Sequence, residues 1–176
     1  MPYLNYRKAV VYMDIAYKIF SDKHSLYAYI REQLQYITEE TDDITAVLAN
    51  TSALLMLELQ DVNWIGFYLY KQGRLVLGPF QGKPAVAEIE VGHGVCGTAA
   101  KTLETQLVED VHSCCNHIAC DSMSKSEIVV PILLADGTLY GVIDIDSPAF
   151  SRFDTEDRME LEHIAEIISD YLKKVY

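Results

Sequence analysis

The sequence contains no long uninterrupted apolar run, although half of its residues are apolar. No segment approaches the roughly 20 apolar residues that a membrane-spanning helix needs, so we expect no membrane association. The stretch from Met1 to Phe20 has basic residues before an apolar run, but Asp14 and Lys18 interrupt that run, which fits a signal peptide poorly. We therefore expect a soluble protein of the cytoplasm.

Cationic residues are scarce as well. The chain has 14 Lys and Arg residues against 26 Asp and Glu residues, which gives a net charge of −12 at pH 7. Nucleic acids and anionic membranes bind clustered Lys and Arg, so the charge argues against both as partners. A small cationic or zwitterionic ligand is the better match to this composition.

Repeats, low-complexity segments and linkers are also absent. A chain of 176 residues can bury one full hydrophobic core and is too short to favour two domains. We expect a single domain over residues 21–176. Residues 1–20 form an N-terminal extension to which the sequence assigns no role.

Cysteine is absent outside one stretch, since all four cysteines, Cys96, Cys114, Cys115 and Cys120, lie between residues 96 and 120. Intracellular thiols are kept reduced, so this clustering indicates thiol chemistry or metal binding rather than structural disulfides. The cysteines and histidines from His112 to Cys120 could in principle hold zinc. Structural zinc sites come as two spaced pairs, however, and this stretch has no second pair, so we expect no bound metal.

The spacing of apolar residues predicts an α+β protein. Helical periodicity predicts helices over about 25–37, 44–59 and 94–102, and a last helix that begins after its cap at Asp154. Alternation predicts hairpins that join 62–70 to 75–77 and 128–134 to 138–146, with a short strand over 106–108. A long loop over 109–125 is expected to be functional. The architecture that follows is an antiparallel β-sheet with helices packed over it.

A series of short motifs carries a family resemblance, in this order along the chain: Asn63-Trp-Ile-Gly-Phe-Tyr-Leu69, Leu77-Gly-Pro-Phe-Gln-Gly-Lys-Pro84, Gly94-Val-Cys-Gly-Thr-Ala-Ala100, His117-Ile-Ala-Cys-Asp121, Ser126-Glu-Ile-Val-Val-Pro131 and Gly141-Val-Ile-Asp-Ile-Asp-Ser-Pro148. The chain resembles the free methionine-(R)-sulfoxide reductases, which are GAF domains turned into enzymes. The resemblance implies a GAF-like fold and the reduction of free L-methionine-(R)-sulfoxide to L-methionine.

Sulfoxide reduction requires a nucleophilic sulfur, an acid that protonates the departing oxygen, and a second thiol that clears the sulfenic acid as a disulfide. By resemblance, Cys120 is the attacking thiol, because the family's catalytic cysteine falls in the His-Ile-Ala-Cys-Asp motif. Cys96 lies at the first turn of a predicted helix, where the helix dipole can lower the pKa of a thiol. That position suits a redox partner, and simple packing beside Gly94 and Gly97 suits Cys96 equally well.

The chain departs from the family pattern at Val86, where well-known members carry the usual resolving cysteine two residues after the Gly-Lys-Pro run. Another thiol must then take this role, or an external reductant must act directly. Cys96 is the first candidate, and Cys114 or Cys115 is the second. A disulfide between the adjacent Cys114 and Cys115 would be strained.

Acidic side chains are predicted to gather around the substrate's amino group. Asp144 and Asp146 share one face of a strand, and Glu127 begins the strand that pairs with it. Buried carboxylates are costly unless a cation meets them, and the ammonium group of a free amino acid would do so. Burial would also raise the pKa of a carboxyl, so one of the three can hand a proton to the sulfoxide oxygen. The alternative is a solvated strand end.

The aromatic residues Trp64 and Tyr68 share a strand face with Gly66, and we expect them to contact the methyl group on the substrate sulfur. Core packing is the competing interpretation, above all for Tyr68. By analogy, backbone N–H groups of the loop, including those of Ile118 and Ala119, receive the substrate's carboxylate.

A closed pocket that binds both the ammonium and the carboxylate would exclude methionine sulfoxide within a peptide. The resemblance further implies an intramolecular disulfide, recycling by thioredoxin with NADPH and thioredoxin reductase, and a role in oxidative stress, with no bound cofactor. Relatives are often homodimers. The competing hypothesis is a non-catalytic GAF domain that senses a small ligand.

Overall fold

The structure is a computed structural model that describes residues 20–113 and 123–175. The expected N-terminal extension, apart from Phe20, lies outside the described residues. So do five residues of the predicted site, namely Cys114, Cys115, Ile118, Ala119 and Cys120.

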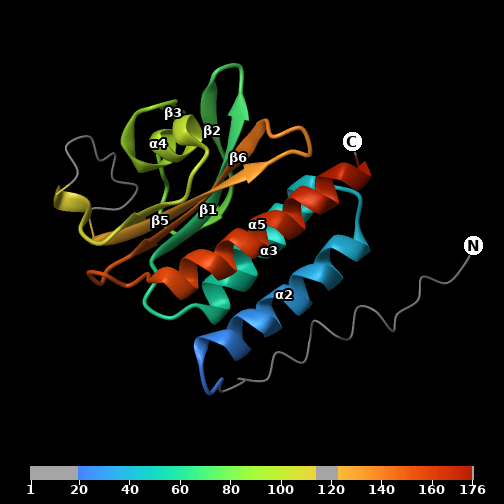
Figure 1. The fold of residues 1–176 in the computed structure, drawn as a ribbon, viewed down its shortest axis with the longest axis horizontal. Helices are drawn as coiled ribbons and strands as arrows, with labels where there is room; N and C mark the ends of the chain where they lie inside the picture. The colour runs from blue at the N-terminus through green and yellow to red at the C-terminus, as the bar shows by residue number, and fades with distance from the viewer. Residues whose placement is uncertain (1–19, 114–122, 176) are drawn as a thin grey trace, which may run out of the picture.

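The centre of the fold is a six-stranded antiparallel sheet, which confirms the predicted α+β class (Figure 1). Its spatial order is β3-β2-β1-β6-β5-β4. The strands are β1 (Trp64–Lys71), β2 (Arg74–Gln81), β3 (Glu88–Glu90), β4 (Gln106–Val108), β5 (Ser126–Leu133) and β6 (Leu139–Ser147). The two predicted hairpins, β1–β2 and β5–β6, join at the middle of the sheet because β1 pairs with β6.

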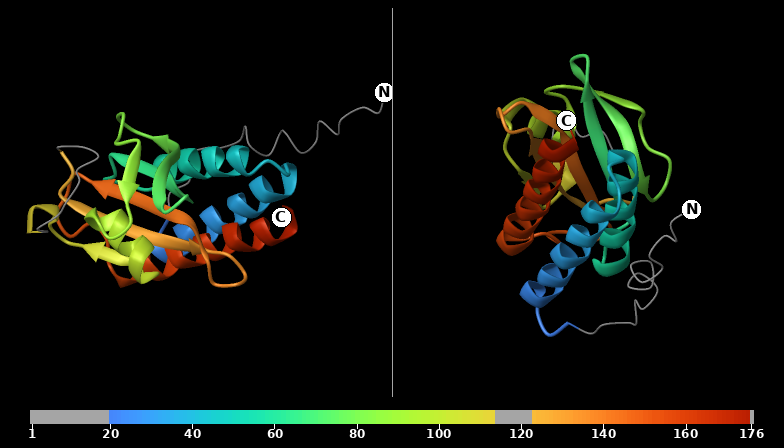
Figure 2. Two further views of the ribbon diagram at one scale, coloured as in Figure 1. Left: turned by 90° about the horizontal axis from the view of Figure 1, so that it is seen from above. Right: turned by 90° about the vertical axis from the view of Figure 1, so that its right-hand side faces the viewer.

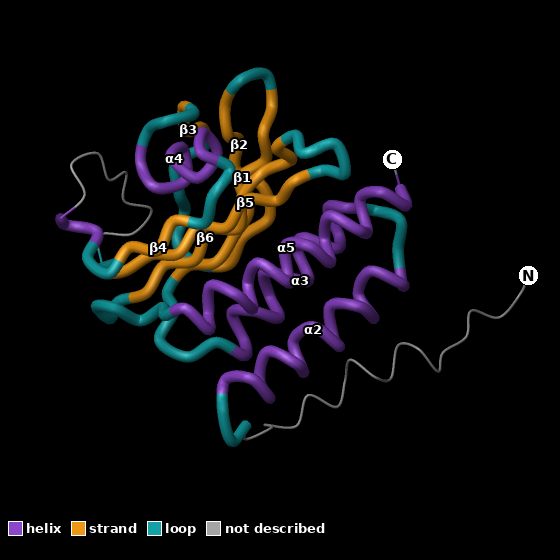
Figure 3. The backbone as a smooth tube through the Cα atoms, in the orientation of Figure 1, coloured by secondary structure: helices purple, strands orange, loops and turns teal. Residues whose placement is uncertain are grey.

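Helices cover both faces of the sheet, as the two turned views show (Figure 2). They are α2 (Lys23–Glu40), α3 (Ile44–Glu58), α4 (Gly94–Thr102) and α5 (Thr155–Val175). Helices α3 and α5 pack against the strands on one face, and α2 packs across α3 and α5 as an outer layer (Figure 3). Helix α4 contacts β5 and β6 and packs on the opposite face. None of the helices in the described part of the chain is long and apolar enough to cross a membrane.

Alternation along the central strands produces two apolar clusters, one on each face of the sheet. Ile65, Phe67, Ile143 and Ile145 belong to the larger cluster, together with residues of α2, α3 and α5. The residues between them in sequence point to the other face, where a smaller cluster packs around α4. Because the middle strands β1, β5 and β6 are buried on both sides over most of their length, polar residues on their α4 face are buried as well.

The helix ends follow the expected capping chemistry. The side chains of Asp22 and Asp43 accept hydrogen bonds from the first-turn N–H groups of α2 and α3. Asp154 Oδ1 accepts from the backbone N–H groups of Glu156 at 2.9 Å and of Asp157 at 3.1 Å, which confirms the predicted cap of α5. Helix α2 runs from Lys23 to Glu40 and is longer than its apolar periodicity indicated.

A buried ion pair joins the start of α2 to the start of α5. Asp157 is fully buried and accepts hydrogen bonds from Lys23 Nζ at 2.6 Å and from Tyr27 Oη at 2.8 Å. Burial, followed by the adjacent Asp157 carboxylate, raises the pKa of the Tyr27 phenol far above its usual value. Tyr27 therefore stays a neutral donor, and the cluster fixes the outer helix layer.

Candidate active site

The α4 face of the sheet brings together the acidic and aromatic residues singled out in the sequence. Trp64 on β1 pairs with Asp146 on β6, and Asp146 pairs with Glu127 on β5. One step along the strands, Gly66 pairs with Asp144, and Asp144 pairs with Val129. The predicted hairpin therefore places Glu127 directly across from Asp146 and one pair away from Asp144, and β1 adds the aromatic wall beside them.

These acids are buried rather than solvated at a strand end. Asp144 is 0% exposed, Asp146 is 1% exposed and Glu127 is 5% exposed. Val129 and Val142 flank them on the same face and belong to the smaller apolar cluster. The surroundings therefore have low polarity, in which carboxylates interact strongly with any cation or donor that enters.

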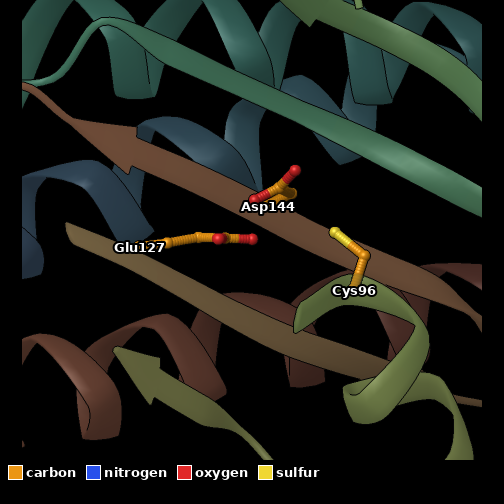
Figure 4. Close-up of side chains that lie close together, drawn as sticks. All are labelled: Cys96, Glu127 and Asp144. Carbon is orange, nitrogen blue, oxygen red and sulfur yellow. The ribbon is translucent and has the colours of Figure 1, made fainter. Parts of the chain in front are cut away.

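Helix α4 brings the thiol of Cys96 to this acidic group. Cys96 is the third residue of α4, in the first turn as predicted, and it is 4% exposed. One ligand atom of each of Cys96, Glu127 and Asp144 lies within 4.8 Å of the others. Figure 4 shows the three side chains extending from α4, β5 and β6 toward the same space. Cys96 thus lies against the acidic group and also belongs to the packing beneath α4.

The close approach of α4 depends on Gly97. A Cβ atom there would lie 2.4 Å from the carbonyl oxygen of Glu90, so no side chain fits between the helix and the end of β3. Gly92 N donates a hydrogen bond to the carbonyl of Gly97 at 2.7 Å, which closes the turn that precedes the helix. Gly92 and Gly97 therefore fix the position of Cys96 between them in the sequence.

The aromatic wall is held rigidly by the loop between β2 and β3. Trp64 Nε1 donates to the carbonyl of Lys83 at 3.0 Å, and Tyr68 Oη donates to the carbonyl of Val86 at 2.9 Å. The Trp64 ring stacks between Phe80 and Tyr68, with ring centroids 5.4 and 6.0 Å away. The polar ends of both side chains are thereby satisfied, which leaves their rings as fixed apolar surfaces.

Sequence reasoning missed the part played by Phe80 and by residues 82–87. The Gly-Pro-Phe-Gln-Gly-Lys-Pro motif was noted, but its individual residues received no role. Phe80 extends the aromatic stack, and the loop carbonyls orient Trp64 and Tyr68. The Gly-Lys-Pro run indicates a turn after the strand, but the sequence carries no signal that the carbonyls of this segment bind Trp64 and Tyr68.

The described part of the predicted loop over residues 109–125 includes a turn of 3-10 helix, Val111–Ser113, and the two ends of the loop are joined beside the site. Val111 N donates to the carbonyl of Lys125, and Lys125 N donates to the carbonyl of Ser147 at the end of β6. The described residues on each side of 114–122 therefore meet just before Glu127. The predicted roles of Cys114, Cys115, Ile118, Ala119 and Cys120 fall on residues outside those described.

A pocket of about 510 Å³ lies elsewhere, between α5 and the β5 edge of the sheet, and none of the predicted site residues lines it. Two of its charged side chains bind each other, because Glu162 accepts hydrogen bonds from Arg158 and from Thr105. The chemistry of the acidic group, with a buried thiol and stacked aromatic rings, makes the α4 face the candidate active site.

Comparison with known proteins identifies the family of the chain. Residues 41–173 match the GAF domain family. The chain is 47% identical over 143 residues to the free methionine-R-sulfoxide reductase of Escherichia coli, covering 81% of this chain and 86% of that protein. It is 49% identical over 129 residues to the Saccharomyces cerevisiae enzyme of the same name, covering 69% and 72%.

Solved structures give the same result. The X-ray structure of free methionine-R-sulfoxide reductase from Neisseria meningitidis in complex with its substrate superimposes with a TM-score of 0.85 at 40% identity, covering 89% of this chain and 94% of that one. The fold, the extent of the matches and their identity lead to one conclusion: this chain belongs to the free methionine-R-sulfoxide reductases, a family of GAF-domain oxidoreductases that act on sulfur.

Proposed function

We propose that this protein reduces free L-methionine-(R)-sulfoxide to L-methionine at the α4 face of the sheet. The observation that carries the proposal is the convergence of Glu127, Asp144 and Cys96 within 4.8 Å in a buried site, beside the stacked Trp64. A relative that shares this fold at 40% identity was solved in complex with its substrate, which supports the same class of ligand here.

Substrate binding follows from charge. The ammonium group of the amino acid lies against the carboxylates of Asp144 and Asp146, where a buried anion gains most from a cation. The S-methyl group lies against the Trp64 ring, and Tyr68 continues that surface. Backbone N–H groups of the loop that includes Ile118 and Ala119 receive the carboxylate. A peptide-bound methionine sulfoxide lacks the free ammonium and carboxylate, so it binds poorly.

The chemical step is a nucleophilic attack by the Cys120 thiolate on the sulfoxide sulfur. The attack forms a bond between the Cys120 sulfur and the substrate sulfur, and Glu127 supplies a proton to the sulfoxide oxygen. The resulting hydroxyl then passes to the Cys120 sulfur as the substrate's sulfur–oxygen bond and the new sulfur–sulfur bond both break, which leaves Cys120 as a sulfenic acid. The substrate sulfur gains two electrons and leaves as methionine, while the Cys120 sulfur loses two. The Cys120 thiol and the sulfoxide are thereby converted to a sulfenic acid and a thioether with no other reactant.

The cycle closes by disulfide formation. The Cys96 thiol attacks the sulfenic acid of Cys120, forms an S–S bond and releases water. Cys96 is favoured over Cys114 and Cys115 because its thiol lies in the acidic pocket itself. A thioredoxin dithiol then reduces the disulfide by exchange, and thioredoxin reductase with NADPH restores thioredoxin. The reaction needs no metal or bound cofactor.

The test is a thioredoxin-coupled assay of NADPH loss. The substrates are free methionine-(R)-sulfoxide and its N-acetylated form, which keeps the sulfoxide but removes the ammonium charge. The proposal expects turnover with the free amino acid and loss of at least about 100-fold in kcat/KM with the acetylated form. Equal activity on both would contradict the assigned role of the acids.

Cysteine-to-serine variants test which thiol attacks the substrate and which one resolves the sulfenic acid. Cys120→Ser should abolish the first turnover, whereas Cys96→Ser should release one equivalent of methionine and then stall. Full turnover by Cys120→Ser would overturn the catalytic assignment. Binding of a small ligand without any turnover by the parent protein would identify a non-catalytic sensor instead.

A further inference from the structure

The three groups that converge in the pocket form a mixed sulfur and oxygen donor set. Cys96 contributes a thiol, and Glu127 and Asp144 contribute carboxylates, each from a different element (Figure 4). All three side chains are at most 5% exposed. The position of Cys96 is fixed by the close backbone contacts of Gly92 and Gly97 around the start of α4. The positions of Glu127 and Asp144 are fixed by the pairing of β5 with β6.

The spacing of these atoms is close to what a tetrahedral cation requires. Zinc binds thiolate sulfur at about 2.3 Å and carboxylate oxygen at about 2.0–2.2 Å, so its ligand atoms lie roughly 3.3–3.8 Å apart. The atoms of Cys96, Glu127 and Asp144 lie within 4.8 Å of one another, so small side-chain rotations complete the geometry. Three protein ligands leave the fourth position of a tetrahedral cation open for a water molecule.

The donor types select the class of cation. Calcium and magnesium prefer six or more oxygen ligands and do not favour a thiolate, whereas zinc and cadmium bind sulfur strongly. Two buried carboxylates beside a thiolate also concentrate negative charge in surroundings of low polarity, and a dication neutralises more of it than an ammonium group does.

We propose that the reduced protein binds one thiophilic divalent cation of the zinc type between Cys96, Glu127 and Asp144, and that the cation inhibits the protein by occupying the substrate's place. Binding displaces the proton of the Cys96 thiol to solvent, so affinity rises with pH. The cation is an inhibitor and not a cofactor. The binding is independent of the proposed function, and the inhibition rests on it.

The direct test uses Cd²⁺ as the probe, because a cadmium–thiolate bond gives an ultraviolet charge-transfer band. The protein is a Cys114→Ser/Cys115→Ser/Cys120→Ser variant, so that Cys96 is its one remaining cysteine. The expected result is a band that saturates at one Cd²⁺ per chain under reducing conditions. A band in the parent protein and none in this variant would overturn the proposal, because the cation would then be held by the cysteines of the 114–120 stretch.

Further substitutions in the same background separate the pocket from a solitary thiol. Cys96→Ser should abolish the band, and Asp144→Asn and Glu127→Gln should each weaken Cd²⁺ binding about tenfold or more. Glu90→Gln is the matched control, because Glu90 is an exposed acid whose side chain is 84% accessible. Since Glu127→Gln or Asp144→Asn could affect folding, the thermal midpoint of each variant without metal is measured alongside. Unchanged affinity in both folded acid variants would overturn the proposal.

A last measurement links binding to inhibition. Zn²⁺ should inhibit the parent protein reversibly, with a chelator restoring activity and free methionine-(R)-sulfoxide competing with the metal. If the parent shows no reductase activity, the proposed function fails, but the Cd²⁺ titration still decides the metal site. If activity is present and the titration shows no cation on Cys96, the metal site fails and the proposed function stands.

Discussion

Glu127 of β5 lies directly opposite Asp146 of β6, and both carboxyl groups are buried. Trp64 pairs with the same Asp146 from the other side, so two acids and an indole form one row across three strands. Like charges opposite each other on a sheet face are unfavourable at low polarity unless a proton or a cation accompanies them. The ammonium of an amino acid is a cation that this row can accept.

Asp146→Asn should therefore weaken the binding of free methionine-(R)-sulfoxide. Removing one negative charge from the row reduces its attraction for the ammonium, and we expect KM to rise about tenfold with a smaller change in kcat. KM and kcat are measured in the thioredoxin-coupled assay. A rise mainly in KM indicates weaker substrate binding, whereas loss of the proton donor would lower kcat. Glu90→Gln, an exposed acid on β3, is the control and should leave both parameters within about twofold. An unchanged KM for Asp146→Asn would remove Asp146 from the binding site.

Gly66→Ala should disturb the aromatic wall. A Cβ atom at Gly66 would lie 2.5 Å from the Trp64 ring and 2.5 Å from Phe80 Cβ, so the indole must move. We expect a loss of about 1–3 kcal/mol in unfolding free energy from overpacking and a shifted tryptophan emission spectrum. Because the chain has one tryptophan, the emission reports on this wall alone.

The control for this change is Gly73→Asn in the β1–β2 turn. A Cβ at Gly73 meets nothing within 4 Å, and asparagine tolerates its φ of 87° better than other residues do. This variant should retain the emission spectrum of the parent. A spectrum of Gly66→Ala that matches the parent would mean that the strand, rather than the indole, accommodates the methyl group.

Local patterns predicted most of the fold. Alternation between Trp64 and Tyr68 and between Val142 and Asp146 identified the two central strands and their faces. The Ala135-Asp136-Gly137 turn located the β5–β6 hairpin, whose residues then pair as expected. Asp144 and Asp146 on one face of β6 indicated the site. The isoleucines that alternate with them predict a buried strand, and buried carboxylates require a cation or a hydrogen-bond donor.

Non-local pairing was not readable from the sequence. The junction of β1 with β6, which places Trp64 beside Asp146, depends on contacts between residues far apart in the chain. The extent of β2 was underestimated, because Gly78 and Pro79 suggest a strand end. In the structure these two residues lie opposite Phe67 alone, as a β-bulge that lets the strand continue. Strand β3 was missed because it is only three residues long, and its one apolar residue, Ile89, is too few to establish an alternation.

Lys23→Gln should destabilise the outer helix layer. Lys23 Nζ donates to Asp157 at 2.6 Å and to Asp154 at 2.7 Å, and Asp157 is buried. Asp157 keeps its hydrogen bond from Tyr27 and its ion pair with Arg152, so we expect a loss of about 1–2 kcal/mol in unfolding free energy rather than the full cost of an isolated buried charge. Lys173→Gln, which removes an exposed pair with Asp170, is the control and should cost less than about 0.5 kcal/mol.

The stabilisation by Lys23 should also depend on pH in a defined direction. The hydrogen bond from Lys23 is the main cause that lowers the pKa of Asp154, so this contribution is present above the unfolded-state pKa and is lost as the pH falls through the lower folded-state pKa. Burial alone would lower the pKa of Lys23, but its bonds to Asp154 and Asp157 outweigh burial and raise it. The stabilisation that comes from the raised pKa of Lys23 is fully present below the unfolded-state pKa of this lysine. It is lost as the pH rises through the higher folded-state pKa of Lys23. The difference between parent and Lys23→Gln, measured by urea unfolding, should therefore be flat from about pH 5 to 9 and shrink below about pH 4.

Val86→Cys tests whether the loop between β2 and β3 can supply a resolving thiol. Val86 is 40% exposed, and its carbonyl, not its side chain, accepts the bond from Tyr68. Its neighbour Ala85 packs against the apolar cluster that contains Cys96. The substitution should therefore leave the aromatic wall intact and add an accessible thiol at the edge of the pocket.

The informative background for Val86→Cys is Cys96→Ser, which we expect to stall after one turnover. In that background Val86→Cys should restore repeated turnover with thioredoxin, whereas Val86→Ser, which adds a hydroxyl of similar size, should not. The number of methionine molecules released per chain, counted with and without thioredoxin, distinguishes the outcomes. Because a new thiol can resolve a sulfenic acid only by contact with it, restored turnover would place residue 86 within reach of the attacking cysteine. If the Val86→Cys/Cys96→Ser variant still stalls after one turnover, a thiol at residue 86 does not reach the sulfenic acid, and Cys96 keeps the role of resolving thiol.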